Sequence, residues 1–556
     1  MGQKYRWHKP DRETIVFLLF LTGMAVYYGW RMFALTPWYD ELYTYYYFIS
    51  RGPVYAAIHW PLPNNHMCYS MLSACLTIFG NSAVSLRGIS YLSSIGSLVL
   101  LFRIGRKCFE RGMALIPVFC FAGMKMVNQL AVQGRGYALV TFCYLAALNM
   151  LLCLISEGKD KVKYYVVFGI SLVVALYAIP SSVYVVVPVC LVGGFILLMR
   201  GKYKRLWLLI LTSLISAVFT VGIYSIVWLA IGSNLLVKSQ DSAYYGMSHA
   251  DVLMRAPFTA LKTGIDYMLA TPYIQSVSRA GYLRRLVDWL GYLLNEYYTG
   301  GKMILALLLI VCVTSAAVSI VLRIRESKVD SKQLAENQED SCDDFISVYL
   351  VCSILCIPLM LIIQCALPYH RVFSFAGVVV AIAFAWFWQG VVRLLAKGSP
   401  LLGKGAVLMK PKRHIAAAGS LWCGIWCVVL LFTLSYNVQY SAREAAIEDA
   451  YRAVDVTQYS RIAVADCDQE YLLKYLYGLD MESENNVRLT TVIEDADCVL
   501  LDRDLLLPEG YFVTRDSVGD WWKFYVTKDT IPAEYLEEQM QAGYENNRFI
   551  FYIKNQ

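Results

Sequence analysis

The sequence predicts a mainly α-helical, polytopic membrane protein with a small α/β or α+β domain at its C-terminal end. Of its 556 residues, 58% are hydrophobic and only 16% are charged, whereas an average soluble protein carries about 25% charged residues. Apolar runs of 16 to 26 residues recur between residues 15 and 434, and a membrane-spanning helix needs about 20 such residues.

Charge divides the chain into two parts. From Ser435 to Gln556 there are 11 Lys and Arg residues against 23 Asp and Glu residues, a net charge of −12. The preceding part holds 38 basic against 19 acidic residues, a net charge of +19. This predicts a transmembrane domain over residues 1–434 and an acidic soluble domain over residues 435–556. Because the basic residues cluster between apolar segments, we interpret them as a topology signal and expect no nucleic-acid partner.

Eleven apolar segments are predicted as membrane spans. They are Ile15–Leu35, Ala83–Phe102, Met113–Leu130, Ala138–Ile155, Tyr164–Ile179, Val183–Met199, Leu206–Ile231, Met303–Leu322, Phe345–Ile363, Val372–Val392 and Ile415–Leu434. The fifth and sixth are short, but together they are too long for one helix, and Pro180-Ser181-Ser182 predicts a turn between them. The run Met67–Phe79 has only thirteen residues, so we expect an interfacial or half-inserted helix there.

Lys and Arg clusters predict which loops face the cytoplasm. With a cytoplasmic N-terminus and eleven spans, nearly all dense basic clusters fall in inner loops, as the positive-inside rule requires. The outer side then holds a first loop at 36–82, a large loop at 232–302 and the acidic domain. We therefore expect a multi-pass plasma-membrane protein whose C-terminal domain is extracytoplasmic. Within the large loop, Val252–Met268 and Tyr282–Tyr298 are predicted as amphipathic helices on the membrane surface.

The acidic domain mixes strand-like and helical runs, which is typical of a small α/β or α+β domain. Strands are predicted at Arg461–Ala465, Cys498–Leu501 and Phe549–Ile553, and helices at Ala442–Ala453, Glu470–Leu476 and Ala533–Gln541. The domain carries no glycine-rich phosphate loop and no metal motif in its sequence, so we interpret it as an accessory or acceptor-docking domain.

Two adjacent carboxylates, Asp40 and Glu41, follow the first predicted span. Carboxylates are costly inside a bilayer, and at its edge they usually face a cavity or take part in chemistry. A carboxylate can deprotonate an attacking hydroxyl or hold a metal ion. The alternative is that both acids only cap the helix that begins after Pro37, since acids favour helix N-termini.

Polar and basic residues are predicted on the same outer side as this acidic pair. They include Asn65, His66, Lys125, Arg135, His370 and Arg371. Arg and Lys side chains can hold phosphate oxygens and stabilise a departing phosphate, so the group suggests an anionic, membrane-embedded substrate. The alternative for Lys125 is that it snorkels to the membrane interface from the end of a span.

Several sequence blocks, taken in order, resemble polytopic GT-C glycosyltransferases, most closely the branch of protein O-mannosyltransferases and aminoarabinose transferases. The blocks are Asp40-Glu41, Asn65-His66, Asn81–Arg87, Gly105–Phe109 and Gln133–Leu139. The resemblance covers about the first 230 residues. Two positions depart from the family pattern, which often has Glu in place of Gln133 and His-Pro-Pro in place of His66-Met67-Cys68.

The resemblance implies a transferase that moves a hexosyl or pentosyl group, with inversion, from a polyprenyl-phosphate-linked donor to a hydroxyl at the extracytoplasmic face. The acceptor would be a glycan, a lipid or a protein. Asp40 would be the general base, Glu41 would orient it or the acceptor, and Arg135 would lie near the donor phosphate. The remaining substrate-binding residues would be Asn65, His66, Lys125, Tyr137, His370 and Arg371. No cofactor is required, and a divalent ion at Asp40 and Glu41 stays open.

A transporter or flippase for a lipid-linked sugar is the alternative function, because it would also contact an anionic headgroup. Against it, the sequence has no visible internal repeat of the kind that many transporters carry, and the polar groups gather at one face of the membrane. A structural or sensory membrane protein is the third interpretation, and it leaves the acidic and basic groups of the outer face unexplained.

Overall fold

The computed structural model describes residues 11–60, 65–156, 161–231, 250, 254–262, 280–329, 338–397, 419, 421–422, 424–426, 428–429, 441–479, 488–515 and 528–555. The chain divides into two compact units. The bundle unit comprises Met1–Met32 and Arg51–Val438, and the tail unit comprises Phe33–Ser50 and Gln439–Gln556. The segment that carries the predicted acidic pair therefore belongs to the same unit as the C-terminal domain.

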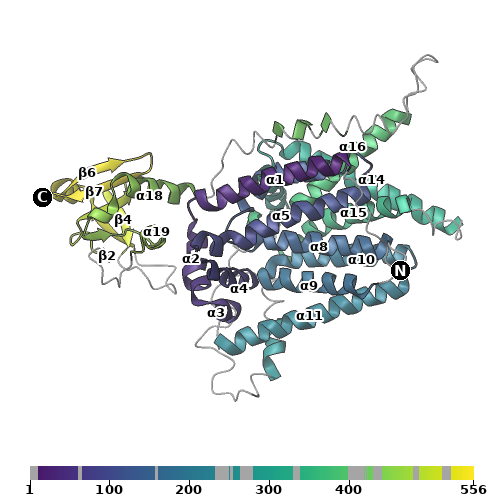
Figure 1. Cartoon of the computed structure of the whole chain (residues 1–556), viewed down its shortest axis with the longest axis horizontal. Coiled ribbons are helices and arrows are strands. Elements are labelled where there is room, and N and C mark those ends of the chain that lie inside the picture. The colour runs from purple at the N-terminus through teal and green to yellow at the C-terminus, as the bar shows by residue number, and fades with distance from the viewer. Residues whose placement is uncertain are drawn as a thin grey trace, which may run out of the picture. The chain divides into compact units, whose positions relative to one another are not determined.

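Helices dominate the chain up to residue 397 (Figure 1). In chain order the elements are α1 (Arg12–Ala34), α2 (Tyr39–Tyr47), η1 (Ile49–Arg51), α3 (Pro53–Ile58), α4 (Met67–Cys75), η2 (Leu76–Phe79), α5 (Ser82–Cys108), α6 (Ile116–Ala122), α7 (Lys125–Leu130), α8 (Tyr137–Ser156), α9 (Val162–Ala178), η3 (Pro180–Ser182), α10 (Val183–Met199), α11 (Tyr203–Ile231), α13 (Tyr282–Tyr297), α14 (Lys302–Val329), α15 (Gln338–Gln364), η5 (His370–Ala376) and α16 (Gly377–Lys397).

Eight of the described helices are long and apolar enough to cross a membrane. Neighbouring long helices pack side by side, with α8 in contact with both α5 and α9 (Figure 1). Large apolar side chains on the outward faces, such as Leu19, Val218 and Ile304, are exposed. Water would disfavour such faces and lipid tails would not, so the structure confirms the predicted polytopic helical fold.

The bundle unit has a charged end and a polar end. Ion pairs define the charged end: Arg106 with Asp11 and Glu13, Arg200 with Asp344, and Arg393 with Glu110. At the polar end, the Arg87 guanidinium donates to the Met32 carbonyl (3.1 Å), and the Gly136 N–H donates to His66 (2.8 Å). Most of the predicted substrate-binding residues lie at the polar end, as described below.

The prediction of one continuous helix over Met113–Leu130 is wrong, because α6 and α7 are separate helices there. The break follows Gly123, where Met124 has an extended backbone (φ −78°, ψ 132°). The Asn128 amide donates to the carbonyls on both sides of the break, Ala122 O (2.5 Å) and Met124 O (2.9 Å). All residues of α6 are buried, and non-helical backbone is tolerated at membrane depth where protein surrounds it. The segment still joins the charged end to the polar end, so it is a broken span.

Other predicted segments are found as helices of various lengths. Tyr164–Ile179 forms α9 with 17 residues, and Met67–Phe79 forms α4 and η2, both shorter than a full span. Tyr282–Tyr298 forms α13. Only residues 254–262 of Val252–Met268 are described, and they are helical. Most of Ile415–Leu434 lies outside the described residues.

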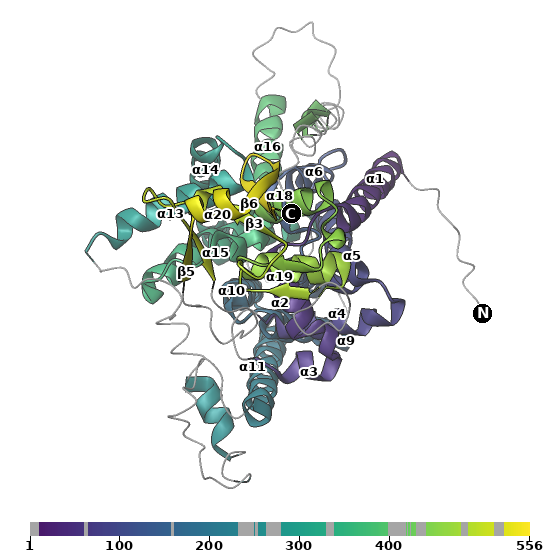
Figure 2. The ribbon, with the colours of Figure 1, turned by 90° about the vertical axis from the view of Figure 1, so that its left-hand side faces the viewer.

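The C-terminal part of the tail unit is a mixed α/β domain, as predicted (Figure 2). Its elements are α18 (Ala442–Ala453), η7 (Val456–Gln458), β1 (Arg461–Ala463), α19 (Cys467–Tyr477), β2 (Arg488–Thr490), β3 (Cys498–Asp502), η8 (Arg503–Leu505), β4 (Tyr511–Arg515), β5 (Lys528–Pro532), α20 (Ala533–Gln539), β6 (Met540–Glu545) and β7 (Phe549–Lys554). Five strands form one sheet in the order β2-β1-β3-β7-β6, parallel among the first three and antiparallel beyond β3, and β4 and β5 form a separate two-stranded antiparallel sheet.

Candidate active site

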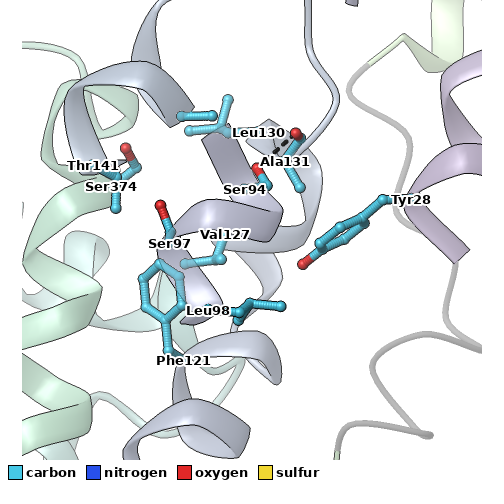
Figure 3. Close-up of a pocket in the computed structure, with 11 residues that line it drawn as sticks. Tyr28, Ser94, Ser97, Leu98, Phe121, Val127, Leu130, Ala131, Thr141 and Ser374 are labelled. Atoms are coloured by element: carbon cyan, nitrogen blue, oxygen red, sulfur yellow. Dashed lines mark hydrogen bonds between the residues drawn. The ribbon is translucent and has the colours of Figure 1, made fainter. Parts of the chain in front are cut away.

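Serines on one face of α5 hold the buried loop between α7 and α8. The Ser94 hydroxyl donates to Ala131 O at 2.7 Å (Figure 3). The Ser90 hydroxyl lies 2.5 Å from Gln133 O and 3.1 Å from Arg135 O. These carbonyls lie outside the helices, where a buried acceptor needs another partner. The serines therefore provide hydrogen-bond donors for the loop carbonyls and fix the backbone position of Arg135.

A small cavity lies beside this loop (Figure 3). Its volume is about 20 Å³ and its polar lining consists of Tyr28, Ser94, Ser97, Thr141 and Ser374. A water molecule needs about 10–15 Å³ of such space and two to four polar partners. The cavity therefore has room for one water molecule and not for a substrate.

His66 lies at the centre of the polar end. Its Nδ1 accepts the Gly136 N–H at 2.8 Å, and its Nε2 lies 3.2 Å from the Arg135 guanidinium. A Cβ atom at position 136 would come within 3.2 Å of the same Nδ1 and 3.3 Å of Ile179, so glycine permits this close approach. The Tyr137 ring meets the imidazole edge-on with centroids 5.1 Å apart. Three residues of the predicted site thus come together from two distant segments.

The hydrogen bond from Gly136 determines the tautomer of His66. Because Nδ1 accepts a hydrogen bond, the proton of the neutral ring must be on Nε2. Burial lowers the pKa of His66 well below its ordinary value, and the charges of Arg135 and Arg371 lower it further, so the ring is neutral. Guanidinium nitrogens only donate. Nε2–H and the Arg135 guanidinium are therefore two adjacent donors, an arrangement that fits a shared anionic oxygen.

The last pair of predicted basic residues begins η5. The His370 ring packs 4.9 Å from the Trp289 ring of α13, and Trp289 Nε1 donates to Pro368 O at 2.9 Å. The Arg371 guanidinium lies over the Tyr369 ring at 4.7 Å. Since the charge of Arg371 acts on the pKa of His66, this pair lies at the polar end as well.

Lys125 and Asn65 have different surroundings. Lys125 is the first residue of α7, which contacts α13 and η5. Asn65 is buried, and its amide donates to Ala56 O (3.1 Å) and His59 O (2.6 Å) at the end of α3. The Asn65 amide thus fixes the chain just before His66, while the substrate-binding role that we predicted for it stays a prediction.

A larger cavity of about 530 Å³ lies among α13, α14, α15 and α16. Its lining is mainly apolar, with Ile357 at its wall and Asp288 and Lys302 as charged members. Tyr292 also lines it, and the Tyr292 ring is 6.5 Å from the His370 ring. The cavity therefore extends up to the group of basic residues.

The acidic pair lies in the tail unit, so the structure does not bring it into one compact unit with the basic residues. Glu41 is buried, and its carboxylate accepts the Trp38 N–H at 3.0 Å. It thus performs the capping role that the sequence offered as the alternative to chemistry. Asp40 is half-buried at the second position of α2. Among the described residues, no group of three His, Cys, Asp or Glu side chains is arranged to hold a metal ion.

The sequence interpretation missed the residues that hold the site. Ser90 and Ser94 are four residues apart in an apolar helix, a spacing that puts both hydroxyls on one face. Serines of this kind are typical of helix interfaces within membranes, so this signal was available. Glu444, which contacts α2 as described below, is remote in sequence and carries no such signal.

Comparison with known proteins finds one matching family model, over part of the chain, and several solved structures of similar fold. Residues 66–228 match the sequence model of dolichyl-phosphate-mannose-protein mannosyltransferases. No curated protein matches the chain. The crystal structure of apo ArnT from Cupriavidus metallidurans is 10% identical, with a TM-score of 0.51 over 97% of this chain and 98% of that chain. The same protein bound to undecaprenyl phosphate is 12% identical, with a TM-score of 0.49 over the same shares of both chains.

An archaeal oligosaccharyltransferase is also similar. AglB from Archaeoglobus fulgidus, in complex with an inhibitory peptide and a dolichol-phosphate, is 11% identical, with a TM-score of 0.45 over 83% of this chain. This chain spans 63% of the length of AglB. The family match and the fold of apo ArnT confirm the predicted resemblance to GT-C glycosyltransferases. The matched range includes His66, Lys125, Arg135 and Tyr137.

Proposed function

We propose that this protein is a membrane glycosyltransferase that moves a sugar from a polyprenyl-phosphate-linked donor to a hydroxyl acceptor. The observation that carries the proposal is the pair of adjacent donors at the polar end, His66 Nε2–H and the Arg135 guanidinium, 3.2 Å apart. A phosphate oxygen accepts hydrogen bonds from both, and charge-assisted bonds of this kind are the stronger ones. The match to lipid-phosphate-dependent mannosyltransferases includes both residues.

Asp40 acts as the general base in this proposal. The acceptor oxygen forms a bond to the anomeric carbon, the bond from that carbon to the phosphate oxygen breaks, and the acceptor proton passes to the Asp40 carboxylate. Polyprenyl phosphate leaves with the electron pair of the broken bond. Donors fixed in advance at the place where this charge develops lower the barrier, and Arg135, Lys125 and Arg371 would supply them.

The donor's lipid chain would lie in the cavity of about 530 Å³ between α13 and α16. Its apolar wall suits an isoprenoid chain. Its Tyr292 lies near His370, so a chain in the cavity would bring its headgroup toward His370 and Arg371. Whether a divalent ion joins Asp40 and Glu41 is a separate matter, which chelation with EDTA followed by the transfer assay decides.

Release of lipid phosphate tests the proposal against the flippase alternative. Membranes that contain the overproduced protein, together with the cell's own acceptors, are incubated with undecaprenyl phosphate bearing mannose, glucose or aminoarabinose, and free undecaprenyl phosphate is measured against membranes without the protein. The proposal requires release with at least one donor, and an Asp40→Asn variant should lose about 10²–10⁴-fold of that rate, the usual contribution of a general base. Movement of the donor across vesicles without its consumption would favour the flippase, and full activity of Asp40→Asn would refute the base role.

The site is proposed to face outward, with the N-terminus in the cytoplasm. In a Cys75→Ser background, which removes an exposed cysteine, we expect Glu509→Cys in the tail unit to react with an impermeant maleimide on intact cells. Arg111→Cys, next to the charged end, should react only after permeabilisation. The reverse pattern would invert the whole assignment of sides.

A further inference from the structure

Side chains from α18 hold the start of α2. The Tyr39 N–H donates to Glu444 Oε1 at 3.1 Å, and the Thr36 hydroxyl donates to Glu448 Oε2 at 2.6 Å. The Ser441 hydroxyl in turn donates to Thr36 O at 2.8 Å. Glu444 and Glu448 are one helical turn apart, so they present their carboxylates on the same face of α18. These partners lie about 400 residues apart in sequence and within one compact unit.

The sequence around α2 explains why it uses a remote acceptor. Its N-cap residue is Trp38, which has no side-chain oxygen, whereas good N-caps are Ser, Thr, Asp or Asn. The Glu41 carboxylate accepts the Trp38 N–H. The first N–H within the helix, that of Tyr39, is left to Glu444, which is 3% exposed. Glu444 therefore adds a second acceptor at the N-terminus of α2, beside that of Glu41.

The other end of α2 packs on α19. The Tyr471 hydroxyl donates a hydrogen bond to the Tyr47 hydroxyl at 2.9 Å, and the Tyr471 ring stacks on the Tyr46 ring with centroids 5.9 Å apart. Lys474 lies over the Tyr46 ring at 5.1 Å. The helices α18 and α19 thus contact α2 at its two ends.

An ion-pair cluster joins α18 to the rest of the domain. The Arg443 guanidinium, next to Glu444, pairs with Asp466 (2.5 Å), Asp468 and Asp502 (3.2 Å). Asp466 caps α19, and Asp502 ends β3. A displacement of the domain's sheet would therefore be passed through α18 to the start of α2.

From these contacts we infer that the C-terminal domain positions Asp40, and that Glu444 is the positioning residue through which it does so. Asp40 directly follows Tyr39, whose N–H Glu444 binds. The inference rests on the proposed role of Asp40 as the base. It predicts a kinetic signature: loss of Glu444 lowers kcat and leaves the KM for the donor unchanged, because the proposed donor contacts belong to the bundle unit.

Hydrogen–deuterium exchange of the full-length protein in detergent tests the contact without any substrate. Glu444→Ala should speed the exchange of the first amides of α2 at least tenfold, whereas Glu444→Gln, which keeps an acceptor oxygen, should leave it near wild type. Glu538→Ala, an exposed acid on α20, is the matched control. Unchanged exchange of α2 in a folded Glu444→Ala protein overturns the inference. If that variant fails to fold, Glu444→Leu decides, because it fills much of the same buried space and has no acceptor oxygen for the Tyr39 N–H. Unchanged exchange in Glu444→Leu overturns the inference equally.

Kinetics with the best undecaprenyl-phosphate sugar of the release assay complete the test. We expect a roughly ten- to hundredfold lower kcat for Glu444→Ala, the effect of a misplaced reacting group, an unchanged donor KM, and rescue in Glu444→Gln. An equal loss in Glu444→Gln would overturn the inference. Full activity of Asp40→Asn would instead refute the proposed base role of Asp40, and the exchange result would still stand.

Discussion

The basic residues and the acidic pair of the proposed site are held by different means. Arg135 sits in a loop whose carbonyls are bound by serines of a neighbouring span, 45 residues away or less. Asp40 sits on a helix capped by Glu444, 405 residues from the capped N–H. In the proposed function, donor binding thus depends on packing inside the bundle unit, and base placement depends on contacts inside the tail unit. Variants in the two regions should therefore separate donor affinity from turnover.

Among the variants of the bundle unit, Arg135→Ala is expected to have the largest effect. It removes a hydrogen-bond donor of the proposed phosphate site, and loss of one such donor costs about 10²–10³-fold in rate. In contrast to Glu444→Ala, it should also raise the donor KM, because the ground-state phosphate uses the same contact. Lipid-phosphate release at varied donor concentration measures both constants.

Arg135→Lys is the matched control. It keeps the charge but loses the planar fork of donors, so it should recover part of the affinity and little of kcat. A donor KM that is unchanged in a folded Arg135→Ala protein would place the phosphate elsewhere and remove the contrast between the two regions.

The fold was largely predictable because its strongest signals are local. Apolar length found the long helices, and the strand and helix runs of the tail predicted α18, β1, β3 and β7. The break after α6 was not predicted, because Met113–Leu130 is mostly apolar and the interruption depends on tertiary partners. The Asn128 side chain binds carbonyls on both sides of the break, and the apolar pattern does not predict this contact.

The sequence predicted which residue types form the site better than it predicted the contacts that hold them in place. Charge and family blocks pointed to His66 and Arg135, which the structure joins. They did not distinguish the neighbours Asp40 and Glu41, of which Glu41 caps α2. That distinction depends on which carboxylate turns inward, and side-chain direction on a short helix depends on what packs against it. The partner in this case, α18, is formed by the far end of the chain.

Ser90→Ala should have a moderate effect within the same comparison. It removes the hydroxyl that binds the loop carbonyls next to Arg135, and one such hydrogen bond is worth about 0.5–1.5 kcal/mol. We expect a rise in donor KM of about twofold to tenfold and no change in α2 exchange. Ser97→Ala is the control, because the Ser97 hydroxyl donates to Ser93 O within α5 itself. Equal effects of the two variants would show that α5 as a whole, and not the loop contact, matters.

The smallest expected effect is the response of donor binding to pH. Burial and the charges of Arg135 and Arg371 lower the pKa of His66 well below about 6.5, so the ring stays neutral as the pH falls from 7.5 to 6. The phosphodiester of the donor does not titrate in this range either. The donor KM should therefore stay constant, and no step should occur near pH 6.5. Since the unfolded chain would take up the proton at about pH 6.5 and the folded chain would not, stability contributed by His66 is present above that pH and falls below it.

Donor KM is measured at half-unit pH steps in wild type and in His66→Asn, which keeps an acceptor for the Gly136 N–H. Both profiles should be flat. A step near pH 6.5 in wild type that disappears in His66→Asn would show that the imidazole titrates in the site, and the fixed tautomer that defines the two adjacent donors would have to be given up.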